Sequence, residues 1–305
     1  MSNSTGYPLT FLIVALGISA PWWLGNYWLG ILTVAFYFGV FAMGWDLLFG
    51  FAGEVNFGPT FLIGLGAYSA GLMNNAGVGI PLCLVGGGLT AVVGGVLLAL
   101  PALRLRGPYF GLVTLVAVLL LLDAIVIFAG VTGGEIGMMV PSVLSVSASV
   151  NYWYALGFLV ISAAILFTIS RSALGLILQA TGQDRIEAAA LGFNVTKFKV
   201  AAFCISALFS GLAGAMLTFY QGTASVDQLV DLSIAVQIII AVVFGGRRTI
   251  LGGVLGAMFL ILFQQLLLPL GQLNTFIVSG IALLVIIFVP DGVLGYALRL
   301  RERRA

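Results

Sequence analysis

The chain has 305 residues, of which 61% are hydrophobic and only 7% are charged, and its mean hydropathy is +1.20. Water-soluble domains carry about 25% charged residues, so this composition excludes that class and indicates an integral membrane protein. A net charge of +2 argues against nucleic-acid binding. The absence of histidine and the wide spacing of the two cysteines exclude histidine-based acid–base chemistry, zinc clusters and CxxC redox motifs. The apolar runs do not alternate with period two, so an outer-membrane barrel is not expected.

A window of about 20 residues, the length that crosses the hydrocarbon core of a bilayer, finds ten apolar segments. They cover residues 9–23, 28–48, 57–73, 80–100, 109–129, 152–169, 200–220, 229–244, 250–268 and 273–289. The third is shorter and interrupted by glycine, so it is a candidate re-entrant or discontinuous helix, and nine spans stay open as an alternative. The predicted fold class is an all-α integral membrane protein, a polytopic bundle of about ten transmembrane helices that forms a single transmembrane domain over residues 1–305.

The twelve basic residues predict the orientation of this bundle. They form four groups along the chain: Arg104 and Arg106; Arg171, Arg185, Lys197 and Lys199; Arg247 and Arg248; and Arg299, Arg301, Arg303 and Arg304. An even number of predicted spans separates each group from the next, so all twelve fall on one side of the membrane. The positive-inside rule makes this side the cytoplasm, places both termini there if there are ten spans, and puts residues 130–151 and 221–228 outside.

Residues 170–199, named the coupling loop below, form the long polar stretch on the predicted cytoplasmic side. Alanines among charged residues favour a short helix, and Gly192 followed by Asn194 is a typical helix stop. About thirty residues exceed what is needed to join two antiparallel helices, which favours a functional loop over a plain connection on the membrane surface. Small side chains at Ala188, Ala189 and Gly192 are expected to let the short helix enter a groove of a partner.

Residues 50–68 contain five glycines and a proline where the chain enters the membrane. Broken backbone is costly in lipid unless it is buried in protein or lines a wet cavity, so this segment is expected to line a cavity; a polar cytoplasmic turn is the alternative. An asparagine and a glutamate beside broken backbone are typical of groups that hold polar solutes in transporters. The glycine-rich stretch after residue 131 is a second candidate, either a substrate entrance or an exposed loop. The predicted substrate-path residues are Gly53, Glu54, Asn56, Phe57, Gly58, Tyr109, Thr132, Gly133 and Gly134.

Two further carboxylates, Asp46 and Asp123, lie inside apolar runs. A charged group is expensive in a bilayer, so each is a functional candidate by default. The alternatives are a protonated carboxyl group or one that a neighbouring helix satisfies.

Small residues recur every fourth position in two later spans. The sets are Ser206, Ser210 and Gly214; Ala207, Gly211 and Ala215; and Gly252 and Gly256. Such spacing is typical of tight helix packing and predicts close contacts there.

No catalytic motif is recognisable in the chain. Residues 245–249, Gly-Gly-Arg-Arg-Thr, lack the phosphate-binding pattern of ATPases, and no metalloprotease or serine-hydrolase motif occurs. The chain by itself is therefore not expected to be an enzyme or to hydrolyse ATP.

Seven motifs occur in an order that resembles one transporter family. They are residues 50–68, the Arg106 to Thr114 run, Thr132-Gly-Gly with Gly137, residues 188–192, Gly211-Leu-Ala-Gly-Ala215, Gly245-Gly with Gly252-Gly, and Pro290-Asp-Gly-Val-Leu-Gly295. Together they resemble the LivM-type permease subunit of branched-chain amino acid ABC importers, over about residues 28–295.

The resemblance implies a set of partners and a location. These are a second homologous permease in a heterodimer, two cytoplasmic ATPase subunits that bind ATP and magnesium, and an external solute-binding protein, in a bacterial-type inner membrane. The chain itself would carry no cofactor and no metal. The coupling loop matches part of the pattern typical of importer coupling loops, which implies ATPase-coupling roles for Asp184, Arg185, Glu187, Ala188, Ala189 and Gly192.

Residues 54–59 depart from the family pattern. Glu54 replaces a usually neutral polar residue, Asn56 a frequent serine and Pro59 a frequent histidine. Related branches carry urea, short amides or aromatic acids as well as aliphatic amino acids, and an added carboxylate suits a solute rich in N–H donors. The substrate therefore stays open among these classes.

Two other classes of protein compete with this interpretation. An ion-coupled secondary transporter would use Glu54, Asp46 or Asp123 as the carrier and would show paired broken helices in two related halves, but only one clear broken segment is present. A membrane-embedded enzyme would need a nucleophile or metal constellation, which the dispersed acids and the missing histidine argue against.

Overall fold

The computed structural model describes residues 17–103, 105, 108–271, 273, 277 and 280. Helices make up nearly all of this part of the chain. In order, the elements are η1 (Ala20–Trp22), α2 (Asn26–Asp46), the π-helix η2 (Leu47–Phe51), α3 (Pro59–Asn75), α4 (Ile80–Ala102), α5 (Pro108–Ile127), α6 (Ala129–Thr132), η3 (Gly134–Ile136), β1 (Met138–Met139), α7 (Ala148–Arg171), α8 (Ala173–Gln183), α9 (Arg185–Ala190), α10 (Val195–Gln221), β2 (Thr223–Ala224), α11 (Val226–Leu229), α12 (Leu232–Gly245), α13 (Leu251–Leu266) and η4 (Leu268–Leu270).

Eight of the ten predicted spans coincide with helices: α2, α3, α4, α5, α7, α10, α12 and α13. The first predicted span, 9–23, lies mostly outside the described residues, and the tenth, 273–289, lies almost entirely outside them. Six helical stretches in the described residues are long and apolar enough to cross a membrane, while α13 is apolar but shorter. The prediction of an all-α polytopic membrane protein is confirmed.

The third predicted span differs from the expectation in one respect. Helix α3 is uninterrupted from Pro59 to Asn75, so its internal glycines do not break it. The discontinuity lies before it, where α2 passes into the π-helix η2 and then into the irregular residues 52–58. Proline at the first helical turn explains why α3 begins at Pro59, because a proline N–H is not needed there.

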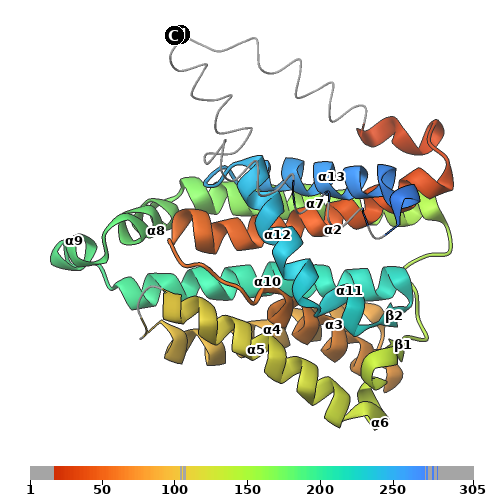
Figure 1. Ribbon diagram of the computed structural model, residues 1–305, viewed down its shortest axis with the longest axis horizontal. Coiled ribbons are helices and arrows are strands. Elements are labelled where there is room, and N and C mark those ends of the chain that lie inside the picture. Colours follow the sequence, from red (N-terminus) through yellow and green to blue (C-terminus); the bar gives the residue numbers. More distant parts are fainter. Residues whose placement is uncertain are drawn as a thin grey trace, which may run out of the picture.

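The long helices run side by side, with their connections gathered at two ends (Figure 1). Helices α2, α7 and α13 form one side of the bundle, α3, α4 and α5 form the other, and α10 lies between them and contacts α2, α3 and α4. One end, at the left in Figure 1, carries α8 and α9, and we call it the basic end because Arg171, Arg185, Lys197 and Arg248 lie there.

The opposite end carries a short β-ribbon and is named the ribbon end. Strands β1 and β2 pair antiparallel, with Met138 opposite Ala224 and Met139 opposite Thr223. This pairing joins residues 130–151 to residues 221–228, the two segments predicted to share the outer side. Six of the twelve basic residues, Arg104, Arg106 and the four after residue 298, lie outside the described residues, so the grouping at two ends agrees with the prediction only for the other six.

Small residues allow the central helices to approach closely. A Cβ atom built on Gly66 of α3 would clash with the backbone of Gly211 in α10, and one built on Gly214 would lie 2.5 Å from the carbonyl oxygen of Ile63. A Cβ on Gly256 of α13 would clash with the carbonyl of Ala241 in α12. The predicted packing role of the small-residue stripes is confirmed. Any larger side chain would push these helices apart.

Candidate functional site at the basic end

The buried end of α2 is joined to the turn between α12 and α13. The Asp46 side chain is fully buried; its Oδ1 accepts a hydrogen bond from the Arg248 amide at 2.9 Å, and its Oδ2 accepts one from the Ile250 amide at 2.9 Å. The Arg248 Nε donates to the Gly50 carbonyl at 2.7 Å. Arg248 and Ile250 have φ angles of 65° and 54°, a strained backbone for residues with side chains. Of the roles considered for Asp46, the structure supports a carboxylate satisfied by neighbouring elements.

Residues 52–58, the broken backbone after η2, find hydrogen-bond partners within the protein. The Glu54 amide donates to the Leu48 carbonyl at 3.0 Å. The Trp45 indole Nε1 donates to the Asn56 carbonyl at 2.6 Å, and the Asn56 Oδ1 accepts from the Gly58 amide at 2.8 Å. Protein groups thus replace the water that the sequence led us to expect around this segment.

Side chains of this segment point alternately in and out. Asn56 is 1% exposed, whereas Gly53, Val55 and Phe57 are exposed. Asn56 was expected on a cavity wall, but its side chain is buried; its Oδ1 serves the turn into α3, and its Nδ2 has no hydrogen-bond partner in the described residues.

Glu54 forms an ion pair that the sequence did not reveal. Its Oε1 lies 2.5 Å from the Lys199 Nζ, and the side chains are only 17% and 7% exposed, respectively. The polar loop was predicted to end at Lys199. In the structure α10 already begins at Val195, and Lys199 lies on the buried face of this helix. A lysine one residue before an apolar run indicated that Lys199 could be buried. Nothing in the sequence indicated which carboxylate would pair with it.

Residues 57 and 58 pack against the first turns of helix α5. The Phe57 amide donates to Thr114 Oγ1 at 3.0 Å, and a Cβ on Gly58 would clash with the Thr114 carbonyl. The Phe57 ring packs over Gly111, where a Cβ would lie 2.7 Å from the ring. Thr114 was not among the predicted site residues, although it binds Phe57 and contacts Gly58.

The remaining predicted path residues lie along or beyond α5. Tyr109 is 66% exposed near the start of the helix. Thr132 bonds through its Oγ1 to the Ile125 carbonyl at 2.6 Å, and Gly133 adopts a φ of +77° against Gly137. Ile125, which Thr132 contacts, comes fourteen residues after Gly111 in α5, about 20 Å along the helix at 1.5 Å per residue. The structure therefore brings residues 53–58 and Tyr109 to the basic end and Thr132, Gly133 and Gly134 to the ribbon end.

Asp123 lies on the exposed side of α5. It shares that side with Tyr109, Leu112, Val116 and Leu120, which recur at the spacing of one helix face and are each at least half exposed. No shielding helix covers this carboxylate within the described part of the chain.

The coupling loop contains two helices, α8 and α9, where its alanines and charges predicted one short helix. Helix α8 ends against residues 51–53: a Cβ on Gly182 would lie 2.6 Å from the Phe51 carbonyl oxygen, and a Cβ on Gly53 would lie 2.8 Å from the Gly182 carbonyl oxygen. Gly182 was not predicted as a site residue. A glycine inside a helix-forming run is a signal of close backbone approach that could have indicated it.

Helix α9 is short and capped at both ends. The Asp184 carboxylate accepts from the Ile186 and Glu187 amides at 2.7 and 3.0 Å, as an N-cap does. At the other end Gly192 has a φ of +89°; its amide bonds to the Ala189 carbonyl, and the next amide bonds to Ala188. This is a Schellman cap, so the predicted helix stop at Gly192 is confirmed.

The outward face of α9 is not the one expected. Ala188 is 2% exposed and packs against the rest of this chain, so it is not available to enter a partner's groove, and Gly192 is held by its cap conformation. Arg185 reaches back to within 3.5 Å of the Leu103 carbonyl at the end of α4. Glu187 and Ala189 are exposed, and Ile186 and Leu191 expose 79% and 74% of their surface. The exposed surface of α9 therefore combines large apolar side chains with the charged Glu187 and differs from the expected wedge of small residues.

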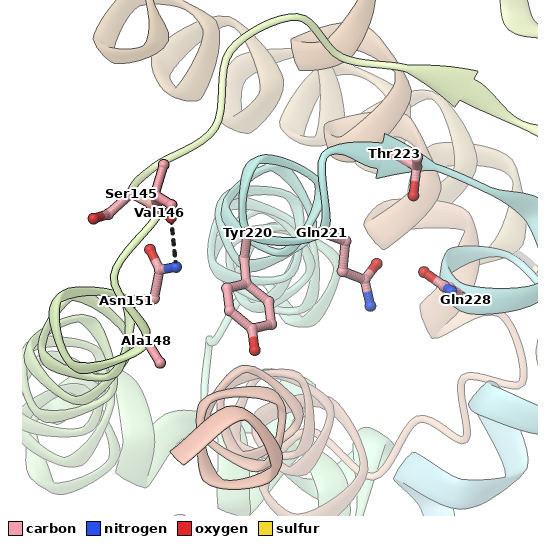
Figure 2. Close-up of a pocket in the computed structure, with 8 residues that line it drawn as sticks. All are labelled: Ser145, Val146, Ala148, Asn151, Tyr220, Gln221, Thr223 and Gln228. Carbon is pink, nitrogen blue, oxygen red and sulfur yellow. Dashed lines mark hydrogen bonds between the residues drawn. The ribbon is translucent and has the colours of Figure 1, made fainter. Parts of the chain in front are cut away.

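The ribbon end contains a cavity of about 510 Å³ between the start of α7 and the end of α10. Figure 2 shows Tyr220 and Gln221 pointing into this space from α10, with Asn151 on the opposite wall. The lining is uncharged: Ser145, Val146, Ala148, Asn151, Tyr220, Gln221, Thr223 and Gln228. These residues fall in or beside the two segments predicted to lie outside, but none had been singled out.

Comparison with known proteins gives a consistent result. The family model described as the permease component of the branched-chain amino acid transport system matches residues 27–290. The high-affinity branched-chain amino acid transport system permease proteins LivM of Salmonella typhimurium and Escherichia coli K12 are 28% and 27% identical to this chain; each match covers 96% of this chain and 76% of the relative. The autoinducer 2 import system permease protein LsrC of Escherichia coli O157:H7 is 27% identical, over 80% of this chain and 72% of that protein. No solved structure matches the chain.

Proposed function

Because this chain belongs to the family of permease components of branched-chain amino acid transport systems, we propose that it is the membrane subunit of an ATP-driven importer for branched-chain amino acids or a related small polar solute. The match over residues 27–290 carries this proposal. It confirms the family resemblance predicted from seven motifs. An ion-coupled carrier loses support, since Glu54 is paired with Lys199 and Asp46 is bonded to two backbone amides.

The coupling loop is the part that meets the ATPase subunits. Helix α9 projects from the basic end and exposes Ile186 and Leu191 beside the polar Glu187. Exposed apolar side chains on a short polar loop mark a protein contact surface. ATP and magnesium are bound by two partner ATPase subunits, and this chain supplies no cofactor of its own.

A second homologous permease packs against the exposed face of α5. That face is apolar except for Asp123, and a carboxylate facing lipid is costly. Contact with a sister subunit removes this cost when the partner offers a hydrogen-bond donor. The heterodimer would also enclose a solute path along α5, from Thr132, Gly133 and Gly134 at one end to Phe57 and Tyr109 at the other.

The orientation follows from the positive charges. The basic end faces the cytoplasm of a bacterial-type cell and the ribbon end faces outward in the inner membrane, with both termini cytoplasmic if there are ten spans. An external solute-binding protein docks at the ribbon end. The uncharged polar cavity at the ribbon end supports this assignment, because a solute released by the binding protein would meet hydrogen-bonding side chains there.

The test is purification and reconstitution. The tagged chain should co-purify with a second permease and two ATPase subunits, and vesicles that contain this complex and the binding protein should accumulate radiolabelled leucine only when ATP is supplied. Parallel assays with urea, acetamide and phenylacetate assign the substrate class. Uptake driven by a proton or sodium gradient in vesicles that contain this chain alone would overturn the proposal.

The docking surface has its own test. Leu191→Glu should lower the recovery of ATPase subunits with the tagged chain by about tenfold, the effect of losing one interface hot spot. Val146→Glu is the matched control, since Val146 is 97% exposed but lies at the ribbon end. Equal recovery with both variants would remove α9 from the interface.

A further inference from the structure

We propose that residues 51–58 form a relay that carries movement of the coupling loop to α5, and we call them the relay segment. This inference rests on the proposed function, since it requires that the coupling loop respond to ATPase subunits. It adds Gly182, Gly53 and the Glu54–Lys199 pair as positioning residues for transport. None of them needs to touch the solute.

The first contact joins backbone to backbone. Gly182, in the last turn of α8, has no room for a Cβ because the Phe51 carbonyl oxygen lies 2.6 Å from the position such an atom would take. In return, Gly53 leaves no room for a Cβ beside the Gly182 carbonyl and adopts a φ of +70°. A contact without side chains has no rotamers to absorb a displacement, so a shift of α8 must displace the relay segment.

The second contact is electrostatic and follows the coupling loop into α10. Lys199 sits one turn after the start of that helix, and its Nζ lies 2.5 Å from the Glu54 Oε1. Both side chains are largely buried, so solvent screens the pair weakly. The relay segment is therefore held at two neighbouring residues, by α8 at Gly53 and by α10, which follows the coupling loop, at Glu54.

The relay segment is attached to α5 by its other half. The Phe57 amide donates to Thr114 Oγ1, and Gly58 lies directly on the Thr114 carbonyl. Helix α5 carries the exposed face with Tyr109 and Asp123 that is proposed to meet the solute path and the sister subunit. Movement received at Gly53 thus reaches α5 within five residues.

The π-helix η2 provides the joint. Residues 47–51 make wider-spaced hydrogen bonds than an α-helix, and such turns often occur at functional positions. Behind them, Asp46 and its bonds to Arg248 and Ile250 fix the end of α2. The relay segment is thus fixed to the protein at its start, where Asp46 holds the end of α2. It is contacted by α8 at Gly53 and is bound to α5 through Phe57 and Gly58.

Coupling is measured as leucine taken up per ATP hydrolysed by the complete complex in vesicles, relative to the unmodified complex. Gly182→Ala should lower this ratio by about tenfold, within the range of coupling between linked sites, while ATP hydrolysis continues. Gly157→Ala in α7 is the matched control, because nothing lies within 4 Å of a Cβ there. An unchanged ratio for Gly182→Ala overturns the relay.

A second experiment does not depend on the folding of that variant. In a background of Cys83→Ala and Cys204→Ser, the pair Glu54→Cys and Lys199→Cys removes the ion pair and should lower the ratio. A reversible bifunctional thiol reagent that joins the two cysteines should restore the ratio, and reductant should lower it again. A merely structural pair would change thermal stability without this reversible change in coupling.

A cross-link that stops uptake, or leaves the ratio unchanged, overturns the proposal. If the unmodified complex takes up no solute, the proposed function fails instead, so the two failures are distinguishable.

Discussion

At the basic end the connecting segments are bound directly to the helices, whereas at the ribbon end two segments meet beside an open polar cavity. Asp46 accepts two backbone amides and Glu54 pairs with Lys199, so the carboxylates of the basic end are matched by donors. At the ribbon end, β1 and β2 pair over two residues. Within the described residues, two acceptors, Asn151 Oδ1 and Gln221 Oε1, are buried there without a hydrogen-bond partner; the basic end has an unpaired buried donor, Asn56 Nδ2, but the carboxylates of Asp46 and Glu54 are matched.

The basic end is therefore suited to holding a fixed geometry, and the ribbon end to accepting hydrogen bonds from a solute. Matched charges and backbone contacts hold one geometry, because breaking any of them leaves a buried polar group unpaired. Unmatched acceptors beside a cavity leave hydrogen-bonding capacity for an incoming N–H or O–H group. Substitutions at the basic end should therefore be costly for folding, and substitutions of cavity oxygens at the ribbon end should be nearly free.

The largest effect is expected from Lys199→Met, which leaves Glu54 without its cation. Breaking a buried pair from one side costs about 3 kcal/mol, and the thermal unfolding midpoint of the purified chain in detergent should fall clearly. The double variant Glu54→Gln with Lys199→Met should recover most of the loss, since no charge is then unpaired. A single variant as stable as the unmodified chain would show that the ion pair is not maintained in solution.

A smaller loss is expected from Asp46→Asn. The amide keeps one acceptor but turns an NH₂ group toward a backbone N–H, which leaves a buried donor unsatisfied and costs about 2 kcal/mol. Thermal unfolding measures it, and Asp123→Asn, the same substitution at an exposed position, should stay within about 0.5 kcal/mol. Equal effects of the two substitutions would contradict the role of Asp46 in holding the 246–250 turn.

The arrangement of spans was predictable because hydropathy and charge act locally. Apolar length located eight helices, and the positions of the basic residues correctly grouped the connections at two ends. Gly192 was predictable as a helix stop because a cap depends on neighbouring residues only.

The contacts of the site were not predictable from the same sequence. Glu54 meets Lys199 across 145 positions, and Asp46 meets Arg248 across 202. Apart from Thr114 and Asp123, helix α5 is apolar on all sides, so no stripe of polar residues indicates which face packs inward. The burial of Ala188 was missed for a related reason: a run of three alanines carries no signal that distinguishes its faces.

Gly192→Ala tests the cap of α9 with an effect of about 1 kcal/mol, because alanine is strained at a φ of +89°. Nothing lies within 4 Å of a Cβ at this position, so the loss would come from backbone conformation alone. Circular dichroism during thermal unfolding measures it, with Gly157→Ala as a control that should be neutral or slightly stabilising. A neutral Gly192→Ala would mean that α9 ends elsewhere in solution.

The smallest effect is expected from Gln221→Met at the ribbon end. The Gln221 Oε1 is buried without a partner within the described residues, so a side chain of similar shape that lacks this oxygen loses no hydrogen bond there and should change the free energy of unfolding by less than about 0.5 kcal/mol. Asn74→Leu is the contrasting variant. Asn74 lies at the same end, but its Nδ2 donates to the Val78 carbonyl and its Oδ1 accepts from the Ser142 amide, so its loss should cost about 2 kcal/mol. If thermal unfolding shows equal losses for both variants, Gln221 has a partner in the assembled molecule, and the ribbon end is held as firmly as the basic end.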